Sequence, residues 1–404
     1  MQIRNTYLVQ LLPIAMLPVN SLFAQSSQPS RSAKDTGTTA IELAVRRVNA
    51  VLHRPLHPTI KGVAPGGGLG AGLAYTAPSR GLWKTSADAI VTVHQYWSAE
   101  VVTGYHERRA EVEAFARARD MKRLDYYGPG TSSQLADRTD FRLRDPVIGT
   151  HGRVRLTPWL AIGGRVEELW PDVGRGRSGA LPSIEQRFSE SVAPGLTSQP
   201  RFGRYEAAVD IHVPPGVGET LYQGTRYRMT YAIYSDQELD RFSFRRVDFE
   251  VQQRFALLAP HHRLTLHGWV STTNTDAGNV VPFYLERTLG GNSGVRSVHE
   301  ERIGSDGTNA TLRGFRNLRF RDRNLLLLQA EYRVPVWGPF DATVFADAGK
   351  VTHRREDLDL SDMKQDVGFS LSVMKGVSTA ARFDVGFGGG EGVRLFLTLG
   401  DVLK

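Results

Sequence analysis

Apolar and polar residues alternate along most of this chain, and the alternation is clearest between residues 324 and 349. In the first segment, one face carries Leu326, Leu328, Ala330, Tyr332, Val334 and Val336, and the other carries Gln329, Glu331 and Arg333. A second segment alternates in the same way after the turn at Trp337-Gly338-Pro339. Because successive side chains of a β-strand point to opposite sides, the pattern predicts a β-hairpin with one apolar face and one charged face.

Similar segments recur over the whole chain and predict about sixteen strands. The first strand opens within the glycine-rich residues 66–72, and the others are expected at 87–95, 99–105, 110–119, 141–147, 153–157, 160–167, 205–213, 221–234, 243–255, 263–272, 326–336, 340–348, 366–373, 380–386 and 393–399. Two long stretches without alternation, 170–203 and 273–324, both follow odd-numbered strands. Most connections after even-numbered strands are short turns. With this strand count, the connection at 121–140 is the only long one among them.

The alternation fits a membrane β-barrel better than a soluble sandwich. In a sandwich the apolar faces form a core and the turns are short at both ends, whereas here the connections at one end are much longer. An even number of antiparallel strands, apolar towards lipid and polar towards the lumen, is typical of bacterial outer-membrane barrels. The predicted fold class is therefore all-β: a transmembrane antiparallel β-barrel with a long extracellular loop that folds into it.

The N-terminal residues divide into two short segments ahead of the barrel. Residues 1–24 have a basic lead, a short apolar run and a small residue before Gln25, which predicts a cleaved signal peptide rather than an anchor helix. Residues 25–61 are expected to form a short periplasmic segment with one amphipathic helix at 38–52, and residues 62–404 the barrel. The glycines at 66–72 lack the Lys-Ser/Thr ending of a phosphate loop and predict a pliable strand instead.

Composition narrows the function classes. The 404 residues are 23% charged with a formal net charge of +8, and the chain has no cysteine, which excludes disulfides and thiolate metal sites. The basic residues alternate along strands and form no recognition helix, so nucleic acid is not an expected partner. No nucleophile elbow and no ligand-spaced histidines occur, so we expect no enzymatic activity, no cofactor and no metal.

Three motifs, in order, resemble the BamA/TamA family of outer-membrane assembly proteins, the bacterial surface antigen superfamily. Pro282-Phe283-Tyr284, Leu289-Gly290-Gly291 and Leu312-Arg313-Gly314-Phe315 resemble the sixth extracellular loop of that family. Glu331-Tyr332-Arg333 and Phe345-Ala346-Asp347-Ala348-Gly349 resemble the next two strands. The resemblance covers roughly residues 62–404. We expect no periplasmic repeat domain of the kind that family carries, because residues 25–61 are too few to form one.

The alternation and the resemblance together predict a loop lock. Glu331 and Asp347 point into the lumen from neighbouring strands, where the planar fork of Arg313 could bridge both carboxylates. The resemblance implies that the motif residues Gly314, Phe315 and Gly349 belong to the same lock, and Arg333 is a candidate charge partner. The alternative is that these are ordinary lumen charges.

Two functions from different classes remain, with a hydrolase as a distant third. An assembly barrel would insert, translocate or display a protein or lipid, with a client protein or a separate periplasmic partner, among outer-membrane lipid and lipopolysaccharide. A weak lateral seam between the first and last strands would favour it; the candidate seam residues are Gly68, Gly70, Gly72, Leu395, Leu397 and Leu399. The alternative is a passive outer-membrane pore, open or plugged, whose basic lumen favours anions.

Overall fold

The computed structural model describes residues 54–79, 81–213, 224–257, 262–291, 310–375 and 378–399. The chain divides into two compact units, Met1–Arg47 and Val48–Lys404, and every described residue belongs to the second. The predicted signal peptide and the predicted helix at 38–52 lie outside the described residues. Within the described part, no helix has the length and apolar character needed to cross a membrane.

Twenty strands and four short 3₁₀ helices make up the described structure. The strands are β1 (Leu56–Lys61), β2 (Gly70–Thr76), β3 (Trp83–Thr92), β4 (Trp97–His106), β5 (Ala110–Tyr126), β6 (Thr139–Arg144), β7 (Val147–Arg155), β8 (Leu160–Leu169), β9 (Asp172–Arg175), β10 (Phe202–Val213), β11 (Gly224–Asp236), β12 (Phe244–Ala256), β13 (Arg263–Thr275), β14 (Arg287–Leu289), β15 (Phe320–Asp322), β16 (Asn324–Trp337), β17 (Phe340–Thr352), β18 (Lys364–Lys375), β19 (Ser378–Gly388) and β20 (Val393–Leu399). The 3₁₀ helices are η1 (Leu135–Asp137), η2 (Ile184–Gln186), η3 (Phe283–Leu285) and η4 (Arg355–Asp357).

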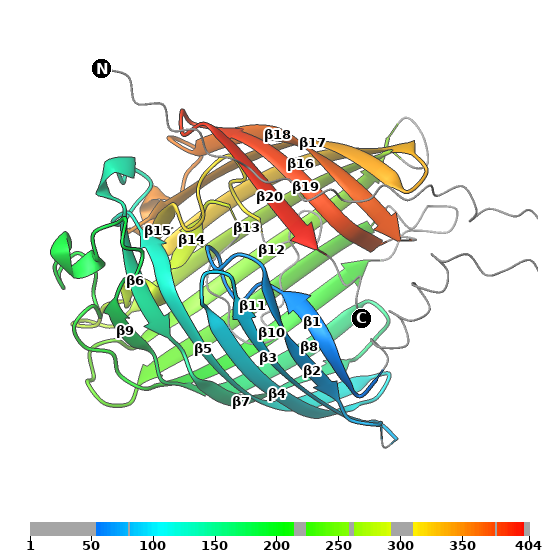
Figure 1. The fold of residues 1–404 in the computed structure, drawn as a ribbon, viewed down its shortest axis with the longest axis horizontal. Coiled ribbons are helices and arrows are strands. Elements are labelled where there is room, and N and C mark those ends of the chain that lie inside the picture. Colours follow the sequence, from blue (N-terminus) through cyan, green and yellow to red (C-terminus); the bar gives the residue numbers. More distant parts are fainter. Residues whose placement is uncertain are drawn as a thin grey trace, which may run out of the picture. The chain divides into compact units, whose positions relative to one another are not determined.

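Sixteen of these strands form the wall of the barrel, each paired antiparallel to the next. The order is β1, β2, β3, β4, β5, β7, β8, β10, β11, β12, β13, β16, β17, β18, β19 and β20. Within the described residues, no pairing joins β1 to β20, the blue and red strands of Figure 1. The predicted all-β class and strand number are confirmed.

The agreement in strand number hides two errors that cancel. The sequence analysis does not predict β1, because Pro58 lacks a backbone N–H and is unusual inside a strand. A proline is tolerated at this position, since β1 is an edge strand that pairs only with β2. In compensation, the segments predicted as two wall strands, 141–147 and 153–157, correspond to only one wall strand, β7, which also covers the residues between them. The first segment overlaps β6, which leaves the wall and pairs with the end of β5 and with β9.

The correction explains the connection that looked too long. With β1 counted, β5 becomes the fifth wall strand, so the connection at 127–146 joins the other long connections at one end of the barrel, here called the long-loop end. The opposite end, called the short-turn end, has the tight connections, such as Gly338-Pro339 between β16 and β17. From β8 onward, the predicted and observed strand ranks agree.

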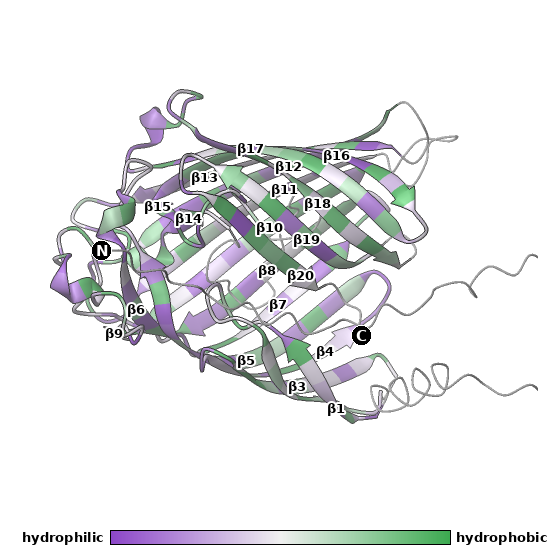
Figure 2. Ribbon diagram, turned by 45° about the horizontal axis from the view of Figure 1, so that its top comes forward, coloured by the Kyte–Doolittle hydropathy of each residue, from purple (hydrophilic) through white to green (hydrophobic). Residues whose placement is uncertain are grey.

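The wall is polar inside and apolar outside. Large apolar side chains such as Leu73, Val101 and Val344 are exposed on the outer face, whereas charged side chains such as Arg204 and Glu250 are buried. Figure 2 shows the two kinds of residue alternating along the strands. Water would disfavour such an exterior, and hydrocarbon would not, so the distribution is that of a transmembrane β-barrel.

A hydrophobic core closes the long-loop end, which the sequence did not predict. It is built from strand ends and from five different connections between wall strands: Tyr96, Met121, Leu124, Tyr126, Phe141, Leu143, Ile184, Ala193, Phe202, Ala232, Tyr234, Phe242, Phe244, Val281, Phe283, Tyr284 and Leu318. Phe283 stands edge-on to Tyr126 and Phe141, with ring centroids 5.3 and 4.9 Å apart. We call this core the cap. Its members lack a common period, because each connection contributes only a few residues.

Candidate functional site, a loop lock inside the barrel

The connection between β13 and β16 brings its tip, Leu312-Arg313-Gly314-Phe315, into the barrel. Its two limbs pair as the ribbon β14–β15. At the tip, the Phe315 N–H donates to the Leu312 carbonyl at 3.2 Å, which forms a tight turn. Leu312, Arg313 and Phe315 are all buried. The long loop therefore folds into the lumen, as the fold-class prediction required.

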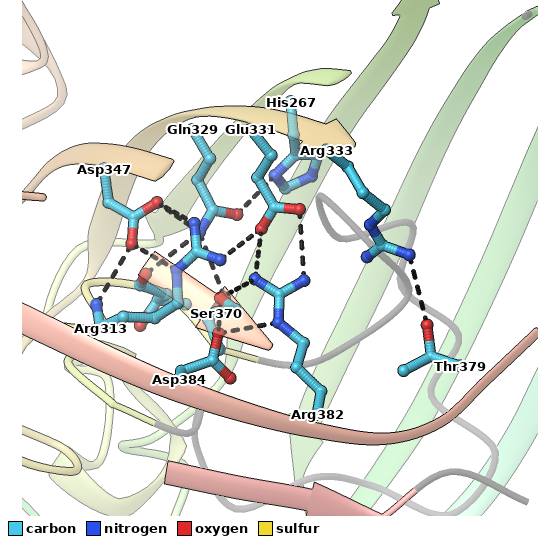
Figure 3. A network of polar contacts seen from close by, with 12 residues as sticks. His267, Arg313, Gln329, Glu331, Arg333, Asp347, Ser370, Thr379, Arg382 and Asp384 are labelled. Atoms are coloured by element: carbon cyan, nitrogen blue, oxygen red, sulfur yellow. Dashed lines mark hydrogen bonds and ion pairs between the residues drawn. The ribbon is translucent and has the colours of Figure 1, made fainter. Parts of the chain in front are cut away.

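Arg313 contacts both of the carboxylates with which it was expected to pair. Its Nε and Nη2 donate to the two oxygens of Asp347 on β17, at 2.8 and 2.6 Å, and Nη1 donates to Glu331 on β16. Its backbone N–H also donates to Asp347 at 3.2 Å. The guanidinium lies 3.6 Å from the centre of the Phe345 ring, a cation–π contact that adds to the ion pairs. Figure 3 shows the three charged side chains converging.

A second arginine, Arg382 on β19, completes the network and was not singled out from the sequence. It donates to Glu331 at 3.1 and 3.3 Å and to Asp384 at 2.7 Å. The Ser370 hydroxyl links the two, since it accepts from Arg382 and donates to Asp384. The Arg-x-Asp spacing on one face of a strand was the available signal. It could not show that the Arg382 side chain extends past β18 and β17 to contact Glu331 on β16.

Arg333 adds to the positive charge around Glu331, as predicted, but its hydrogen bond goes elsewhere. The expectation was that it would balance the negative charge around Glu331, two residues away on the same face. Instead its Nη1 points to the hydroxyl of Thr379 at 3.4 Å, away from the other charges in Figure 3. The direct contact to Glu331 from a neighbouring part of the wall comes instead from Arg382 on β19, three strands along from β16.

Glycines allow the backbone of the loop tip to approach the wall strands closely. A Cβ at Gly314 would stand 2.5 Å from the backbone nitrogen of Gly388, and a Cβ at Gly386 would stand 2.4 Å from the Arg313 carbonyl oxygen. On β17, a Cβ at Gly349 would come within 2.9 Å of the Leu289 side chain of the loop. Phe315 packs beside the tip, in a second buried cluster with Trp269, Leu289, Leu312, Phe320, Leu325, Leu327 and Val351. Gly386 and Gly388 were missed, because their role depends on contact with a distant loop.

Of the predicted seam residues, the glycines do not lie at the edge, whereas the leucines lie on the last strand as expected. Gly70 and Gly72 belong to β2, which pairs with β1 on one side and β3 on the other, so they are not at an edge. A Cβ at Gly72 would stand 1.9 Å from the Ala89 carbonyl oxygen, so close approach explains this glycine better than pliability. Gly68 lies before β2, with φ +73°. Leu395 and Leu397 are exposed on the outside of β20, the last strand; the side chain of Leu399 lies outside the described part.

The contacts of Arg313 hold the loop tip in place, because each of its three guanidinium nitrogens donates to a carboxylate. Among the described residues, no cluster of three or more His, Cys, Asp or Glu could hold a metal ion. Asp366 on β18 faces Asp347 directly across the strand pair and is also buried. The lock therefore joins four adjacent wall strands, β16 to β19, to one loop.

The fold and the site together define the class: a sixteen-stranded antiparallel membrane barrel with a loop locked in its lumen. No model of a known protein family matches the chain, and no curated protein matches it. The chain is similar to a crystal structure of BamA from Haemophilus ducreyi lacking POTRA domains 1–3, with a TM-score of 0.48 and 11% identity over 89% of this chain and 76% of that one.

A second solved structure is Wzi, an outer membrane protein involved in group 1 capsule assembly in Escherichia coli and a carbohydrate-binding β-barrel. The TM-score is 0.33 and the identity 9%, over 89% of this chain and 84% of that one. Both likenesses are too distant to carry an argument. The class therefore rests on the strand pairing and on the burial pattern of this chain.

Proposed function

We propose that this protein is an outer-membrane barrel that helps to insert, translocate or display a protein or lipid. The observation that carries the proposal is the edge between β1 and β20, which is unpaired within the described residues. Backbone groups at an unpaired edge need partners in a bilayer, and an incoming strand is a natural partner for them. The apolar exterior supports the membrane location.

The lock supports the proposal, because it stands directly beside that edge. Arg313 is anchored on β17, Arg382 joins β19 to β16, and Gly314 lies against β19. These contacts hold β16 to β19 as one block, next to β20. If the strands beside an unpaired edge are held together, β1 and β20 can separate while the remaining strands of the barrel stay paired.

The alternative is a passive pore that favours anions. Lumen-facing arginines support it, since Asp210 alone is contacted by Arg153, Arg226 and Arg228. The cap and the infolded loop oppose free flow, because both occupy the path through the barrel. A plugged pore would conduct only after the loop or the cap moves.

Reconstituted vesicles can test the assembly function. An unfolded outer-membrane barrel client is diluted from urea into vesicles with or without this protein, and folding is followed by the change in gel mobility of the client. We expect several-fold faster folding with the protein present. No acceleration over protein-free vesicles, together with a steady conductance in planar bilayers, would favour the pore.

A reversible bridge across the edge makes the test specific. The chain has no cysteine, so single cysteines at Ile60 of β1 and Leu397 of β20, both exposed on the outer face, can be joined by a reducible linker. We expect the bridged protein to lose the acceleration and to regain it on reduction. The matched control joins Val344 on β17 to Phe369 on β18, which are paired neighbours, and should leave the acceleration unchanged.

A further inference from the structure

Two buried acids face each other inside the loop lock. Asp347 on β17 and Asp366 on β18 are directly opposite in the strand register, and only 2% and 3% of the two residues are exposed. The two carboxyl groups are close enough to share a hydrogen bond. Like charges directly opposite each other destabilise a sheet, and two carboxyl groups in contact away from water cannot both be ionised. The pair is therefore expected to hold one proton.

The two acids have very different partners. Asp347 accepts three hydrogen bonds from Arg313 and one from the Gln329 amide. Within the described residues, neither carboxyl oxygen of Asp366 has a hydrogen-bond partner. Donors stabilise the ionised form of a carboxyl group, whereas burial without donors favours the neutral form. The negative charge therefore fits Asp347, and the proton fits Asp366.

The cations near Asp366 are engaged elsewhere. Arg313 of the loop is close to it, but all three guanidinium nitrogens of Arg313 already donate to Asp347 and Glu331. Lys364 lies two residues away on the same side of β18, and its Nζ stands 5.9 Å from the centre of the Phe320 ring. No ion pair reaches Asp366 from the described residues.

The other groups around Asp366 are neutral or negative. Its strand partner on β19 is Gly388, which has no side chain. Glu331 on β16 and Asp384 on β19 belong to the same network, and Arg382 donates to both. Ionisation of Asp366 would add a further negative charge to this buried group without adding a cation.

The loop tip covers Asp366. A Cβ at Gly314 would stand 2.5 Å from the Cβ of Asp366, so the backbone of the tip lies directly against this side chain. An ionised carboxyl group that no donor of the chain contacts needs water. Water reaches this carboxyl group when Gly314 lifts from the wall, so ionisation of Asp366 and release of the tip are coupled.

We propose that one proton on Asp366 keeps the loop locked, and that loss of this proton at alkaline pH releases the loop tip. With the proton, Asp366 is neutral and can lie beneath Gly314. Without it, the buried charge favours the state in which the tip is lifted and water enters. The device does not depend on the assembly function, because it would control a plugged pore in the same way.

A nitroxide spin label on Arg316→Cys can report the release. Arg316 directly follows the tip motif and is half-buried, and the chain has no other cysteine. The purified full chain is placed in vesicles, and gel mobility confirms that the barrel stays folded. We expect the ratio of mobile to immobile label to rise between about pH 7 and 10, by up to about 10-fold per pH unit, as the release of one proton requires.

Two variants connect the effect to Asp366. Asp366→Asn resembles the protonated acid and cannot ionise, so its label should stay immobile over the same pH range. The matched control is Asp210→Asn, which removes another buried lumen acid, on β10, that Arg226 and Arg228 contact. This control should keep the pH dependence of the wild type, because it leaves Asp366 in place.

Infrared spectroscopy decides the matter if Asp366→Asn does not fold. The C=O stretch of a protonated carboxyl group should be present at neutral pH and disappear as the label becomes mobile. The spectrum is recorded in Glu286→Gln, because burial raises the pKa of Glu286 to about 8 and its carboxyl group would add a second band.

Four results would overturn the proposal. The first two are a wild-type label that stays immobile at alkaline pH and an equal pH dependence in the wild type and Asp366→Asn. The third is the absence of a protonated-carboxyl band at neutral pH. The fourth is an Asp366→Asn label that is already mobile at neutral pH, which would mean that Asp366 holds the tip as a carboxylate.

Discussion

Replacing Arg313 with alanine is the sharpest test of the lock. The change removes the contacts to Asp347 and Glu331 and the cation–π contact with Phe345 at once. The side chain is almost fully buried, so water cannot easily replace what is lost. Removing one partner of a buried ion pair typically costs about 3–5 kcal/mol, because the other charge is left buried without compensation.

Remaining partners place the expected loss at the lower end of that range. Asp347 keeps the Gln329 amide at 3.1 Å, and Glu331 keeps Arg382. We therefore expect Arg313→Ala to lower the free energy of unfolding by about 3 kcal/mol. Arg313→Lys keeps the charge but loses the paired contact, and should lie between the wild type and the alanine variant.

Urea unfolding in lipid vesicles, followed by gel mobility, measures this free energy. Arg354→Ala is the control, since its pair with Glu356 is exposed to solvent and should contribute little to stability. In a double-mutant cycle with Asp347→Ala, the two changes should be less than additive, because they remove the same contact. A loss below about 1 kcal/mol for Arg313→Ala, or strict additivity, would refute the lock.

A cysteine pair at positions 313 and 347 locates the loop tip independently. The chain has no native cysteine, so a disulfide between Arg313→Cys and Asp347→Cys can only report this contact. Efficient bridging places the tip against β17 in solution. A folded barrel that does not bridge would show that the loop lies elsewhere.

Three further predictions concern the loop and the cap. Gly314→Ala should lower the unfolding free energy by about 1–3 kcal/mol, since the new Cβ would stand 2.5 Å from β18 and β19 atoms. Urea unfolding measures this loss beside the control Gly62→Ala, whose Cβ would meet only the Gly68 carbonyl oxygen, at 3.7 Å, and equal losses would contradict the close packing. Phe283→Ala should cost about 3–5 kcal/mol of cap packing and make the cap sensitive to protease, whereas unchanged proteolysis would contradict a packed cap. Burial, and then the charge of Asp322, raises the pKa of Glu286 to about 8; the unfolded chain therefore ionises first, so stability should fall as pH rises from about 4.5 to 8. Glu286→Gln should flatten that part of the stability-versus-pH curve, and identical curves for the two proteins would refute the shift.

The sequence predicted the barrel wall well, because alternation is a local property. Residues 326–348 place Glu331 and Asp347 on the inner face whatever surrounds them, since the period of a strand is two. The same reasoning failed at β1, where a proline hid the pattern, and at β6 and β7, where a strand leaves the wall. Alternation cannot show whether a segment continues the barrel or pairs above it.

The sequence by itself therefore determined the class, the faces of the strands and the three charged residues that meet in the lumen. Only the tertiary structure decided which charges make direct contact: Arg382 joins Glu331, and the hydrogen bond of Arg333 goes to Thr379. It also decided that five connections build one cap and that Gly386 and Gly388 receive the loop tip. The physical reason is that these contacts join residues far apart in the chain, and their distances depend on how the whole wall curves.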